Sequence, residues 1–597
     1  MVEQAVISPE QARTLHGLFL TRVDATPDKV AYRYFHHNNW CELTWMQMRS
    51  EVARWQVALS KLGLERGDRV AIMLRNGPIW IAFDQAAMSL GLVGVPLYTV
   101  DRPDNIAYIV NDADVKVLLF ETDAQWQGLR TVIDQLSGVL RFISVENLPH
   151  AKSPRLITMA EFLPRNAVFL TDLSGLSTDL ASIIYTSGTT GKPKGVMLSH
   201  GNMLSNAHAC LTTFVVTGED VFLSFLPLSH TFERTLGYYL AVMVGATVAF
   251  ARSIALLSED LQFIRPSLLI SVPRIYERVY GNIRAKLEVS SILSRKLFYL
   301  AVEIGWARFE YAQGRGAWQA SFLLWPLLQK WVAQKVLDKL GGNLRVAISG
   351  GAALAPEFSR VFIGLGLPIV QGYGLTETSP VITGNPLLSN YPDSVGPPIQ
   401  GMQLRLGIQA ELQVKGPGVM MGYWHNPTAT AQAIDSDGWF STGDIAHISD
   451  TGHVYITGRL KDIIVMSNGE KIPPTDMELA ILHDPLFDQV MIFGEAHPYL
   501  VAIAVINPEV WLHFASEVGI RPDMPEALTD SRVEAKILRR IARNLRGFPG
   551  YAKVNRVLLL REAWSIENGL LTPTLKLKRD DVSLRYAGQI RHLYQGH

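Results

Sequence analysis

The sequence predicts an α/β protein with a large N-terminal domain of stacked α/β sheets, followed by a smaller α+β C-terminal domain. Two observations predict this class. Up to about residue 400, short apolar strands alternate with helical segments, the pattern of parallel sheets. Beyond that point the strands become short and alternating, with glycine turns between them. A chain of 597 residues also exceeds one ordinary core, so it should divide into two or more domains.

The N-terminal region begins with helical spacing over residues 8–60, where Thr26-Pro27-Asp28 and Thr44-Trp45 look like helix starts. A helix is expected at residues 79–90. Strands are expected at residues 70–74, 94–98, 115–120, 180–185, 221–225, 246–251, 268–272, 344–348 and 368–371. The longest uncharged run, residues 235–251, is too short for a membrane span and predicts a buried helix and strand.

The pattern of apolar and turn residues changes after residue 400. Alternating strands at residues 403–406, 411–414 and 453–456 predict a small antiparallel unit that closes the large domain. Strands near Val490 and Val501 and helices near Glu478 and at residues 531–546 then predict the second domain. We place the boundary at Leu460, giving domains of residues 1–459 and 460–597.

Composition excludes several classes of protein. Lys+Arg and Asp+Glu balance at 55 each, so net charge offers no case for nucleic acid as a partner. Cys41 and Cys210 lie far apart, which suits a reducing compartment and excludes a disulfide framework. The N-terminus lacks a basic region followed by an apolar core, so we expect no signal peptide and a cytoplasmic protein.

The most informative stretch runs from Leu180 to Val196, where a strand rich in isoleucine gives way to hydroxyls, glycines and lysines. Glycines allow close backbone approach, successive N–H groups can turn toward an anion, and lysines add charge, so the loop is suited to polyphosphate. The residues that would hold it are Thr186, Ser187, Gly188, Thr189, Thr190, Lys192 and Lys194. The spacing does not match a P-loop, because Pro193 stands where the P-loop helix would begin.

Two further stretches follow predicted strands, where nucleotides bind in parallel sheets. The first contains Gly350, Gly351 and Ala352. The second, Gln371-Gly-Tyr-Gly-Leu-Thr-Glu-Thr378, includes Gln371, Gly372 and Gly374 around Tyr373. Tyr373 offers a flat face for a purine, Thr376 a phosphate donor, and Glu377 a hard oxygen ligand for Mg²⁺.

The Tyr185-Thr-Ser-Gly-Thr-Thr-Gly-Lys-Pro-Lys-Gly195 and Tyr373-Gly-Leu-Thr-Glu377 motifs closely resemble those of the adenylate-forming superfamily. The resemblance implies an adenylation domain followed by a mobile C-terminal domain that carries the catalytic lysine. It further implies ribose contacts from Asp444 and Arg459, a hinge at Lys461, and catalytic roles for Thr186, His230, Glu377 and Lys576. The final motif departs from the common Pro-x-Thr-x-x-Gly-Lys form, so Lys578 remains a rival to Lys576.

The Leu571-Thr-Pro-Thr-Leu-Lys576 ending resembles the long-chain fatty acyl-CoA synthetase branch. That branch implies fatty acid, ATP and coenzyme A as substrates, with Mg²⁺ bound by Glu377. A basic surface for the phosphates of coenzyme A is expected on the small domain, with Lys471, Arg539, Arg540, Arg543 and Arg546 as candidates. The oligomeric state stays open, a homodimer being one option.

Two alternatives remain at this point. One is a fatty acyl-AMP ligase that loads an acyl carrier protein, and the other is a membrane-associated fatty-acid uptake or scaffold protein. The Trp-rich helical insertion at residues 281–341 bears on the second. Its aromatics at helical spacing predict packing on the domain core, but the same pattern fits a peripheral contact with a membrane.

Overall fold

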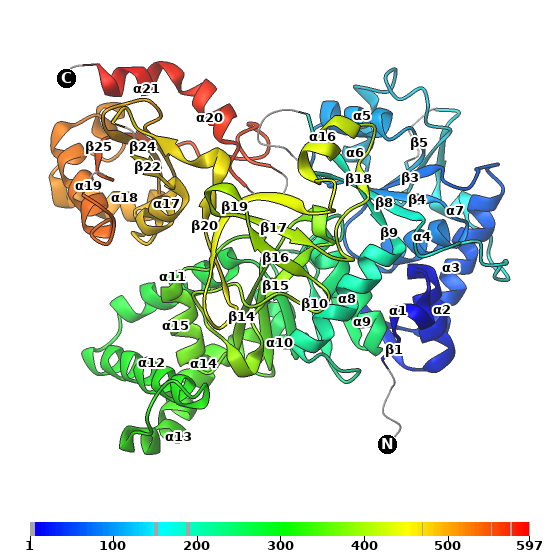
Figure 1. Ribbon diagram of the computed structural model, residues 1–597, viewed down its shortest axis with the longest axis horizontal. Helices are drawn as coiled ribbons and strands as arrows, with labels where there is room; N and C mark the ends of the chain where they lie inside the picture. Colours follow the sequence, from blue (N-terminus) through cyan, green and yellow to red (C-terminus); the bar gives the residue numbers. More distant parts are fainter. Residues whose placement is uncertain are drawn as a thin grey trace.

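The computed structural model describes residues 6–148, 153–186, 192–468, 470–550, 552–572 and 576–595, without the side chains of residues 285 and 525 (Figure 1). Two largely parallel sheets dominate the large domain. The first has the strand order β15-β14-β13-β12-β10-β11-β1-β2. Its strands are β1 (Val30–His36), β2 (Asn39–Thr44), β10 (Val221–Ser224), β11 (Thr247–Phe250), β12 (Leu268–Ser271), β13 (Val346–Ser349), β14 (Ile369–Gly374) and β15 (Val381–Gly384).

The second sheet has the order β18-β9-β8-β4-β3-β5-β6-β7. Its strands are β3 (Arg69–Met73), β4 (Val93–Pro96), β5 (Val115–Phe120), β6 (Arg141–Ser144), β7 (Leu156–Thr158), β8 (Leu180–Thr186), β9 (Lys194–Ser199) and β18 (Gly422–Tyr423). Strands β8 and β9 form an antiparallel hairpin in which Thr186 pairs with Lys194. The predicted phosphate-binding residues Thr186 and Lys194 therefore lie opposite each other at the end of the two strands.

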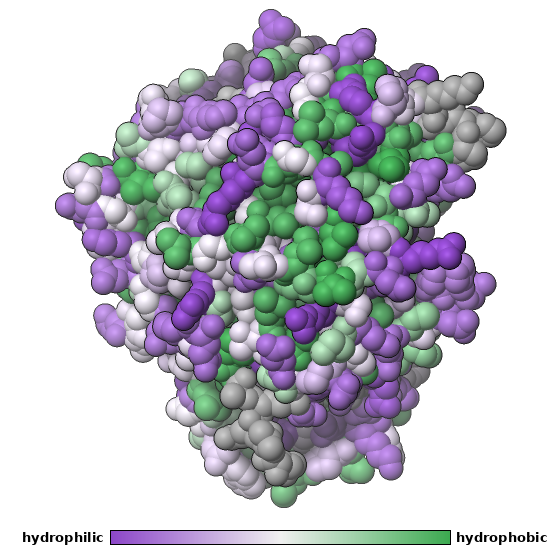
Figure 2. All heavy atoms as spheres, turned by 90° about the vertical axis from the view of Figure 1, so that its right-hand side faces the viewer, coloured by the Kyte–Doolittle hydropathy of each residue, from purple (hydrophilic) through white to green (hydrophobic). Residues whose placement is uncertain are grey.

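Buried helices join the two sheets into one core. They include α2 (Leu15–Ala25), α3 (Trp45–Ser60), α4 (Pro78–Ser89), α8 (His200–Phe214) and α9 (Leu240–Val244), which follows a π-helical segment at Glu233–Tyr239. The run Trp80–Ser89 of α4 is buried on every side, as expected for a helix enclosed within a large core. Seen from the side of the N-terminal strands, the surface carries apolar residues mixed with polar ones (Figure 2).

A small antiparallel sheet, β16-β17-β19-β20, closes the large domain, as the sequence predicted. Its strands are β16 (Gln403–Leu406), β17 (Glu411–Lys415), β19 (Phe440–Ile448) and β20 (Val454–Arg459). The chain then enters a region with a hydrophobic core of its own. This core is built from β23 (Phe487–Phe493), β24 (Leu500–Ile506), β25 (Val554–Leu560) and the helices α17 (Pro474–Leu482), α18 (Pro508–Val518) and α19 (Ser531–Asn544).

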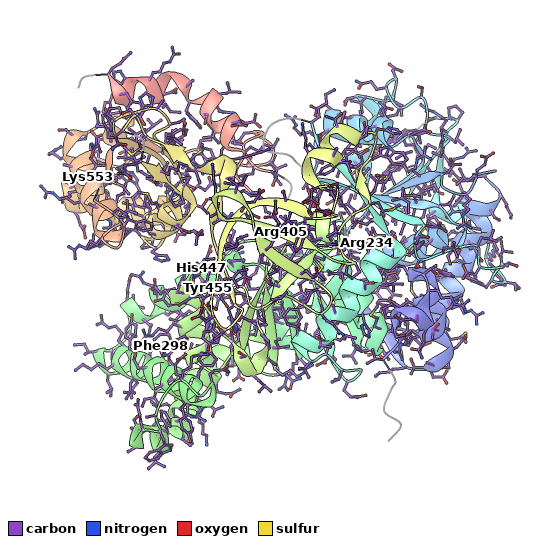
Figure 3. All side chains as sticks on the ribbon, viewed as in Figure 1. Arg234, Phe298, Arg405, His447, Tyr455 and Lys553 are labelled. Atoms are coloured by element: carbon purple, nitrogen blue, oxygen red, sulfur yellow. The ribbon has the colours of Figure 1, made fainter. Side chains whose placement is uncertain are left out.

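A helical lobe, defined here as residues 281–341, extends from the large domain at the lower left of Figure 1. It comprises the end of α11 (Pro273–Glu288), α12 (Ile292–Ala312), and a helical run over residues 320–340 that includes α13 (Trp325–Leu328) and α14 (Gln334–Leu337). Phe298, labelled in Figure 3, is one of its buried residues. Across the described residues, the structure contains no helix with the length and apolar character needed to cross a bilayer.

The predicted α/β class is confirmed, but one local prediction is wrong. Thr26-Pro27-Asp28 does not start a helix, because α2 ends at Ala25 and the chain turns into β1. Residues 30–44 form the hairpin of β1 and β2 where helical spacing was expected. His37 and Asn38, both with positive φ, form its two-residue turn, which is the conformation that matches strand twist.

Candidate active site

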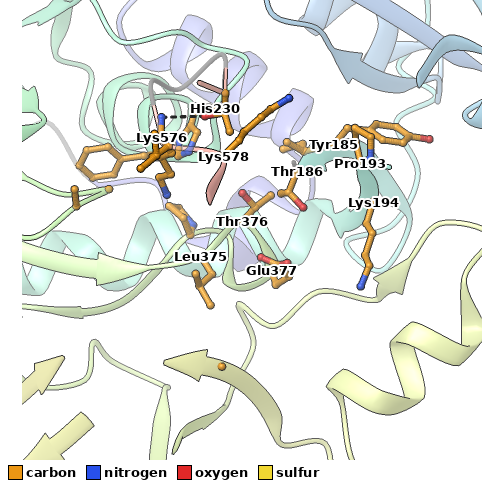
Figure 4. Close-up of a pocket in the computed structure, with 18 of the residues that line it drawn as sticks. Tyr185, Thr186, Pro193, Lys194, His230, Leu375, Thr376, Glu377, Lys576 and Lys578 are labelled. Atoms are coloured by element: carbon orange, nitrogen blue, oxygen red, sulfur yellow. Dashed lines mark hydrogen bonds between the residues drawn. The ribbon is translucent and has the colours of Figure 1, made fainter. Parts of the chain in front are cut away.

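A cavity of about 2000 Å³ lies between the large domain and the C-terminal domain. The ends of β8, β13 and β14 contribute Thr186, Gly350 and Tyr373 to its wall, so it lies where parallel strands of both sheets end. The C-terminal domain contributes Lys576 and Lys578. Figure 4 shows Lys576 beside His230, with Thr186, Thr376 and Glu377 in the middle of the view and Lys194 on the side opposite Lys576.

The β8–β9 hairpin supplies two cations to the cavity. Lys192 Nζ lies 5.0 Å from the ring centre of Tyr108, and Lys194 Nζ lies 4.9 Å from that of Tyr423. Such cation–π contacts hold a lysine in place without neutralising its charge. Ser187, Gly188, Thr189 and Thr190, which the sequence analysis also assigned to phosphate, lie outside the described residues.

The glycine pair after β13 gives close access to backbone. A Cβ at Gly350 would lie 2.8 Å from the ring of Phe232, and Gly351 has φ +79°, a conformation that favours glycine. Both glycines and Ala352 line the cavity. Glycine at both positions therefore brings the main chain to the cavity wall.

Tyr373, Asp444 and Arg459 form a connected group. The Tyr373 hydroxyl donates to Asp444 Oδ2 at 2.5 Å, and Arg459 Nε donates to Asp444 Oδ1 at 2.7 Å. Asp444 and Arg459 face each other on the paired strands β19 and β20. Tyr373 and Arg459 line the cavity while Asp444 lies directly behind them, so a ribose would reach Asp444 by joining or replacing these bonds.

Glu377 lies in a short 3₁₀ turn after β14 and lines the cavity beside Thr376. Its Oε1 accepts a hydrogen bond of 3.0 Å from the Tyr423 hydroxyl, and its backbone carbonyl accepts one from Met420. Mg²⁺ is commonly held by one or two carboxylates together with substrate phosphates. Glu377 is a single carboxylate oriented by Tyr423, with Lys194 and Lys576 nearby, and this fits that arrangement.

His230 lies in the loop after β10, held by Asn76. Asn76 donates to the Leu226 carbonyl at 2.6 Å and accepts from the Leu228 backbone N–H at 2.9 Å. Burial lowers the pKa of His230 to about 4, and the nearby charge of Lys576 acts in the same direction. His230 is therefore neutral at pH 7 and suited to hydrogen bonding.

The backbone of Lys576 is held by Thr572. Its backbone N–H donates to Thr572 Oγ1 at 3.0 Å, and its carbonyl accepts from the Thr572 backbone N–H at 2.8 Å. Its side chain is open to the cavity, yet burial by the surrounding protein lowers its pKa. Arg459 lowers that pKa further, whereas Asp444 and Glu377 oppose the shift. The pKa of Lys576 is therefore influenced by the predicted ribose-binding residues Arg459 and Asp444 and by the predicted metal ligand Glu377.

Lys578 also lines the cavity but has different neighbours. Its Nζ lies 3.6 Å from Asp581 Oδ2. Burial raises the pKa of Asp101 in the large domain, and Lys578 counteracts this shift. Lys578 therefore has Asp101 and Asp581 as neighbours, whereas Lys576 lies near His230, Arg459, Asp444 and Glu377.

Among the described residues, Gln371, Asp444, Lys471 and the four arginine candidates of the small domain do not line the cavity. Gln371 is buried, donates to the Pro392 carbonyl and accepts from the Leu354 N–H, so it braces the loop after Gly351. Lys471 is exposed in β22 (Lys471–Ile472). Of the arginine candidates, Arg540 is engaged by Asp484, with two hydrogen bonds of 2.6 Å.

Cys210 and Ser199 have no setting suited to nucleophilic attack. Cys210 is fully buried, which raises the pKa of its thiol. Ser199 caps α8, and His200 Nδ1 accepts from the Leu15 backbone N–H. Neither the thiol nor the Ser199 hydroxyl is among the groups that line the cavity, so the residues on its wall are suited to binding and charge stabilisation.

Tyr423 and Tyr108 line the cavity but were not predicted from the sequence. Tyr423 comes from β18, a two-residue strand that joins the edge of the second sheet far from β9 in sequence. Tyr108 donates to the Pro193 carbonyl at 3.2 Å and so fixes the phosphate hairpin. No spacing within either local sequence signals these contacts, because both depend on how distant elements pack.

The fold and the cavity fit an enzyme that binds a nucleotide, because Lys192 and Lys194, the Glu377 carboxylate and the C-terminal Lys576 line one cavity. The chain belongs to the AMP-binding enzyme family: that family's model matches residues 19–424, and the model of the AMP-binding enzyme C-terminal domain matches residues 461–597.

Among curated relatives, the long-chain-fatty-acid–CoA ligase FadD15 of Mycobacterium bovis is 31% identical over 95% of both chains. The peroxisomal long chain acyl-CoA synthetase 7 of Arabidopsis thaliana is 30% identical, over 97% of this chain and 86% of the relative. A chloroplastic long-chain-fatty-acid–[acyl-carrier-protein] ligase from the same plant is 27% identical over 99% and 88%.

Solved structures confirm the fold. The adenylation domain of a Mycobacterium chelonae carboxylate reductase superposes with a TM-score of 0.77 at 21% identity, covering 99% of this chain and 94% of that one. ATP-bound MatB from Rhodopseudomonas palustris gives a TM-score of 0.70 at 21% identity, covering 96% and 99%.

Proposed function

We propose that this protein is an AMP-forming ligase that activates a long-chain fatty acid with ATP and transfers the acyl group to coenzyme A. In the first step a carboxylate oxygen attacks the α-phosphorus of ATP. The bond from that phosphorus to the bridging oxygen breaks, and pyrophosphate leaves. In the second step the thiolate of coenzyme A attacks the acyl carbon, and AMP departs with the carboxylate oxygen.

The residues of the cavity oppose the negative charge that accumulates in the first step. Lys576 lies beside His230, where it stabilises charge on the carboxylate and the α-phosphate. Neutral His230 positions the carboxylate by hydrogen bonding. Lys192 and Lys194 hold the β- and γ-phosphates from the hairpin side.

Glu377 would hold Mg²⁺, with Tyr423 orienting the carboxylate. Bound there, Mg²⁺ neutralises phosphate charge during transfer. Tyr373, with Gly350 and Gly351, would enclose the adenine. Asp444 and Arg459 would receive the ribose.

The C-terminal domain must move between the two steps, because Lys576 occupies the space beside His230 where the thiol has to enter. Lys461 lies in the short 3₁₀ turn Leu460–Asp462 that joins the domains and lines the cavity. We assign the hinge to this residue. Lys471 and Arg539, both on the small domain, remain candidates for contacts with the phosphates of coenzyme A.

One observation carries the proposal: Lys576 of the C-terminal domain lines the same cavity as Glu377, Lys192 and Lys194 of the large domain. The test is a pyrophosphate-release panel of carboxylic acids from acetate to oleate, with and without coenzyme A. A preference for long chains supports the proposal. A preference for short or aromatic acids would contradict the long-chain assignment and leave only membership of the AMP-binding enzyme family.

A second acceptor is favoured by one relative, the acyl-carrier-protein ligase named above. Parallel assays with coenzyme A and a phosphopantetheinylated carrier protein separate the two. Thioester formation on coenzyme A is expected.

We also propose peripheral contact with a membrane, because the substrate is a lipid and the helical lobe exposes apolar residues. A scaffold without activity would yield no pyrophosphate in either assay.

A further inference from the structure

The helical lobe has an apolar outer face that packing within the protein does not explain. In the run over residues 320–340, Trp325 and Leu328 are 6% and 7% exposed and belong to the core of the large domain. Leu323, Leu327 and Trp331 of the same run are 74%, 55% and 63% exposed. An element that is apolar on its outer side as well as its inner side is expected to have a further partner.

The exposed residues form one stripe. Leu324, Leu327, Trp331, Lys335 and Lys339 follow one another at intervals of three and four residues, so they share one side of the helical run. We call Leu323, Leu324, Leu327 and Trp331 the outer stripe. The stripe therefore leads from leucines, through a tryptophan, to lysines, which is the order of residues at a boundary between lipid and water.

Charge around the outer stripe is strongly asymmetric. The helical lobe carries nine Lys and Arg against four Asp and Glu, a net charge of +5 in a chain whose net charge is zero. Two of the four acids are already paired, Glu303 with Arg360 at 2.7 Å and Glu310 with Arg315 at 2.9 Å. Lys286 lies against Lys339 and lowers its pKa, so two ammonium groups lie side by side where an anion would relieve their repulsion.

We propose that the outer stripe docks the protein onto a lipid bilayer that contains anionic phospholipids. The leucines and Trp331 enter the boundary between headgroups and acyl chains, and Lys335 and Lys339 contact lipid phosphates. This inference deepens the proposed function and rests on it for its purpose, because long-chain fatty acids partition into bilayers. A second copy of the chain fits less well, since a symmetric pairing would bring two lobes of charge +5 together.

Flotation with vesicles tests the proposal. The full-length protein is mixed with phosphatidylcholine vesicles, or with vesicles of equal parts phosphatidylcholine and phosphatidylglycerol. We expect flotation with the anionic vesicles that falls as salt is raised. The variant Leu327→Glu/Trp331→Glu should bind about tenfold more weakly or worse, because it places charges in the apolar boundary.

Matched variants separate the surface from general effects. Leu388→Glu/Ile408→Glu changes two residues that are 93% and 87% exposed outside the helical lobe, and should float like the wild type. Lys335→Glu/Lys339→Glu should lose the preference for anionic vesicles. Activation of water-soluble octanoate without vesicles should be the same in all of these proteins.

The proposal is overturned if the wild type fails to float with anionic vesicles, or if the outer-stripe variant floats as well as the wild type. It is equally overturned if sedimentation shows a wild-type dimer that the outer-stripe variant dissociates, since a second copy then covers the stripe. Flotation of a protein that activates no carboxylic acid would contradict the proposed function and leave the docking surface standing.

Discussion

The guanidinium of Arg234 and the carboxylate of Asp84 lie 2.5 Å apart, and neither side chain has any exposed surface. Arg234 also donates to Ser182 Oγ and to the Tyr239 hydroxyl, each at 2.8 Å. This ion pair ties α4 to β8, which leads into the phosphate hairpin, and to the π-helical segment that follows His230 (Figure 3 labels Arg234). The ion pair therefore links the part of the cavity wall assigned to the phosphates with the part, near His230, assigned to the fatty acid carboxylate.

Arg234→Leu should cost about 3–5 kcal/mol of unfolding free energy, because it leaves the Asp84 charge buried without its partner. The double variant Asp84→Leu/Arg234→Leu should lose less than the sum of the two single variants. Chemical denaturation measures both. Arg360→Ala, which breaks an exposed ion pair with Glu303, is the control and should cost about 0–1 kcal/mol. Additive losses at Asp84 and Arg234 would show that the pair is not coupled.

Glu233 should make stability depend on pH. It is 1% exposed, and burial raises the pKa of its carboxyl to about 8. The native state therefore keeps this proton where the unfolded chain, with a pKa near 4.5, has lost it, so stability falls as pH rises from 4.5 through 8.

Glu233→Gln removes this titration while keeping the shape. The melting temperature of the variant relative to the wild type should therefore increase steadily from pH 5 to above pH 8. The buried His16, His200 and His230, whose pKa values are lowered to about 4, act in the opposite direction below pH 6.5 but are common to both proteins. A difference that does not vary with pH would mean that Glu233 does not titrate in this range.

Lys576→Ala should lower fatty-acid-dependent pyrophosphate release by about 10²–10³-fold, since a charge aimed at the transition state is lost. ATP affinity, measured by calorimetry, should change only slightly. Lys578→Ala is the matched control, because it removes a lysine of the same cavity whose neighbours are Asp101 and Asp581. If the Lys578 variant proves the inactive one, the catalytic role belongs to Lys578.

Tyr423→Phe should raise the Mg²⁺ concentration needed for half-maximal activity about 10-fold. This is the lower end of the loss expected when a residue that orients a metal ligand is removed. The reason is that the phenylalanine no longer donates to Glu377. Activity at saturating Mg²⁺ should recover most of its wild-type value. Unaltered Mg²⁺ dependence would show that Glu377 does not hold the metal.

Local pattern predicted most of the strands and much of the site. The strand predicted at residues 115–120 matches β5, and Thr44-Trp45 does start α3. These elements are buried regular segments whose residues all favour the same structure. The hairpin of β1 and β2 was missed because its pairing with β11 decides the conformation, which local spacing does not reveal.

The same distinction holds for the site. Thr186, Tyr373 and Glu377 stand in contiguous motifs, so their place at strand ends follows from sequence. Tyr423 and Asp84 act through partners 46 and 150 residues away, and no local signal marks them. The helical lobe shows both outcomes, because Trp325 packs inward as predicted from its spacing while Trp331 of the same run is exposed.

The most direct test of the central claim, that a fatty acid carboxylate attacks the α-phosphorus of ATP, follows oxygen from substrate to product. The purified protein is given a long-chain fatty acid labelled with heavy oxygen in both carboxylate positions, together with ATP, Mg²⁺ and coenzyme A, and the released nucleotide is analysed by mass spectrometry. The account predicts AMP that carries one labelled oxygen for each thioester formed. Unlabelled AMP, or ADP as the nucleotide product, would contradict it.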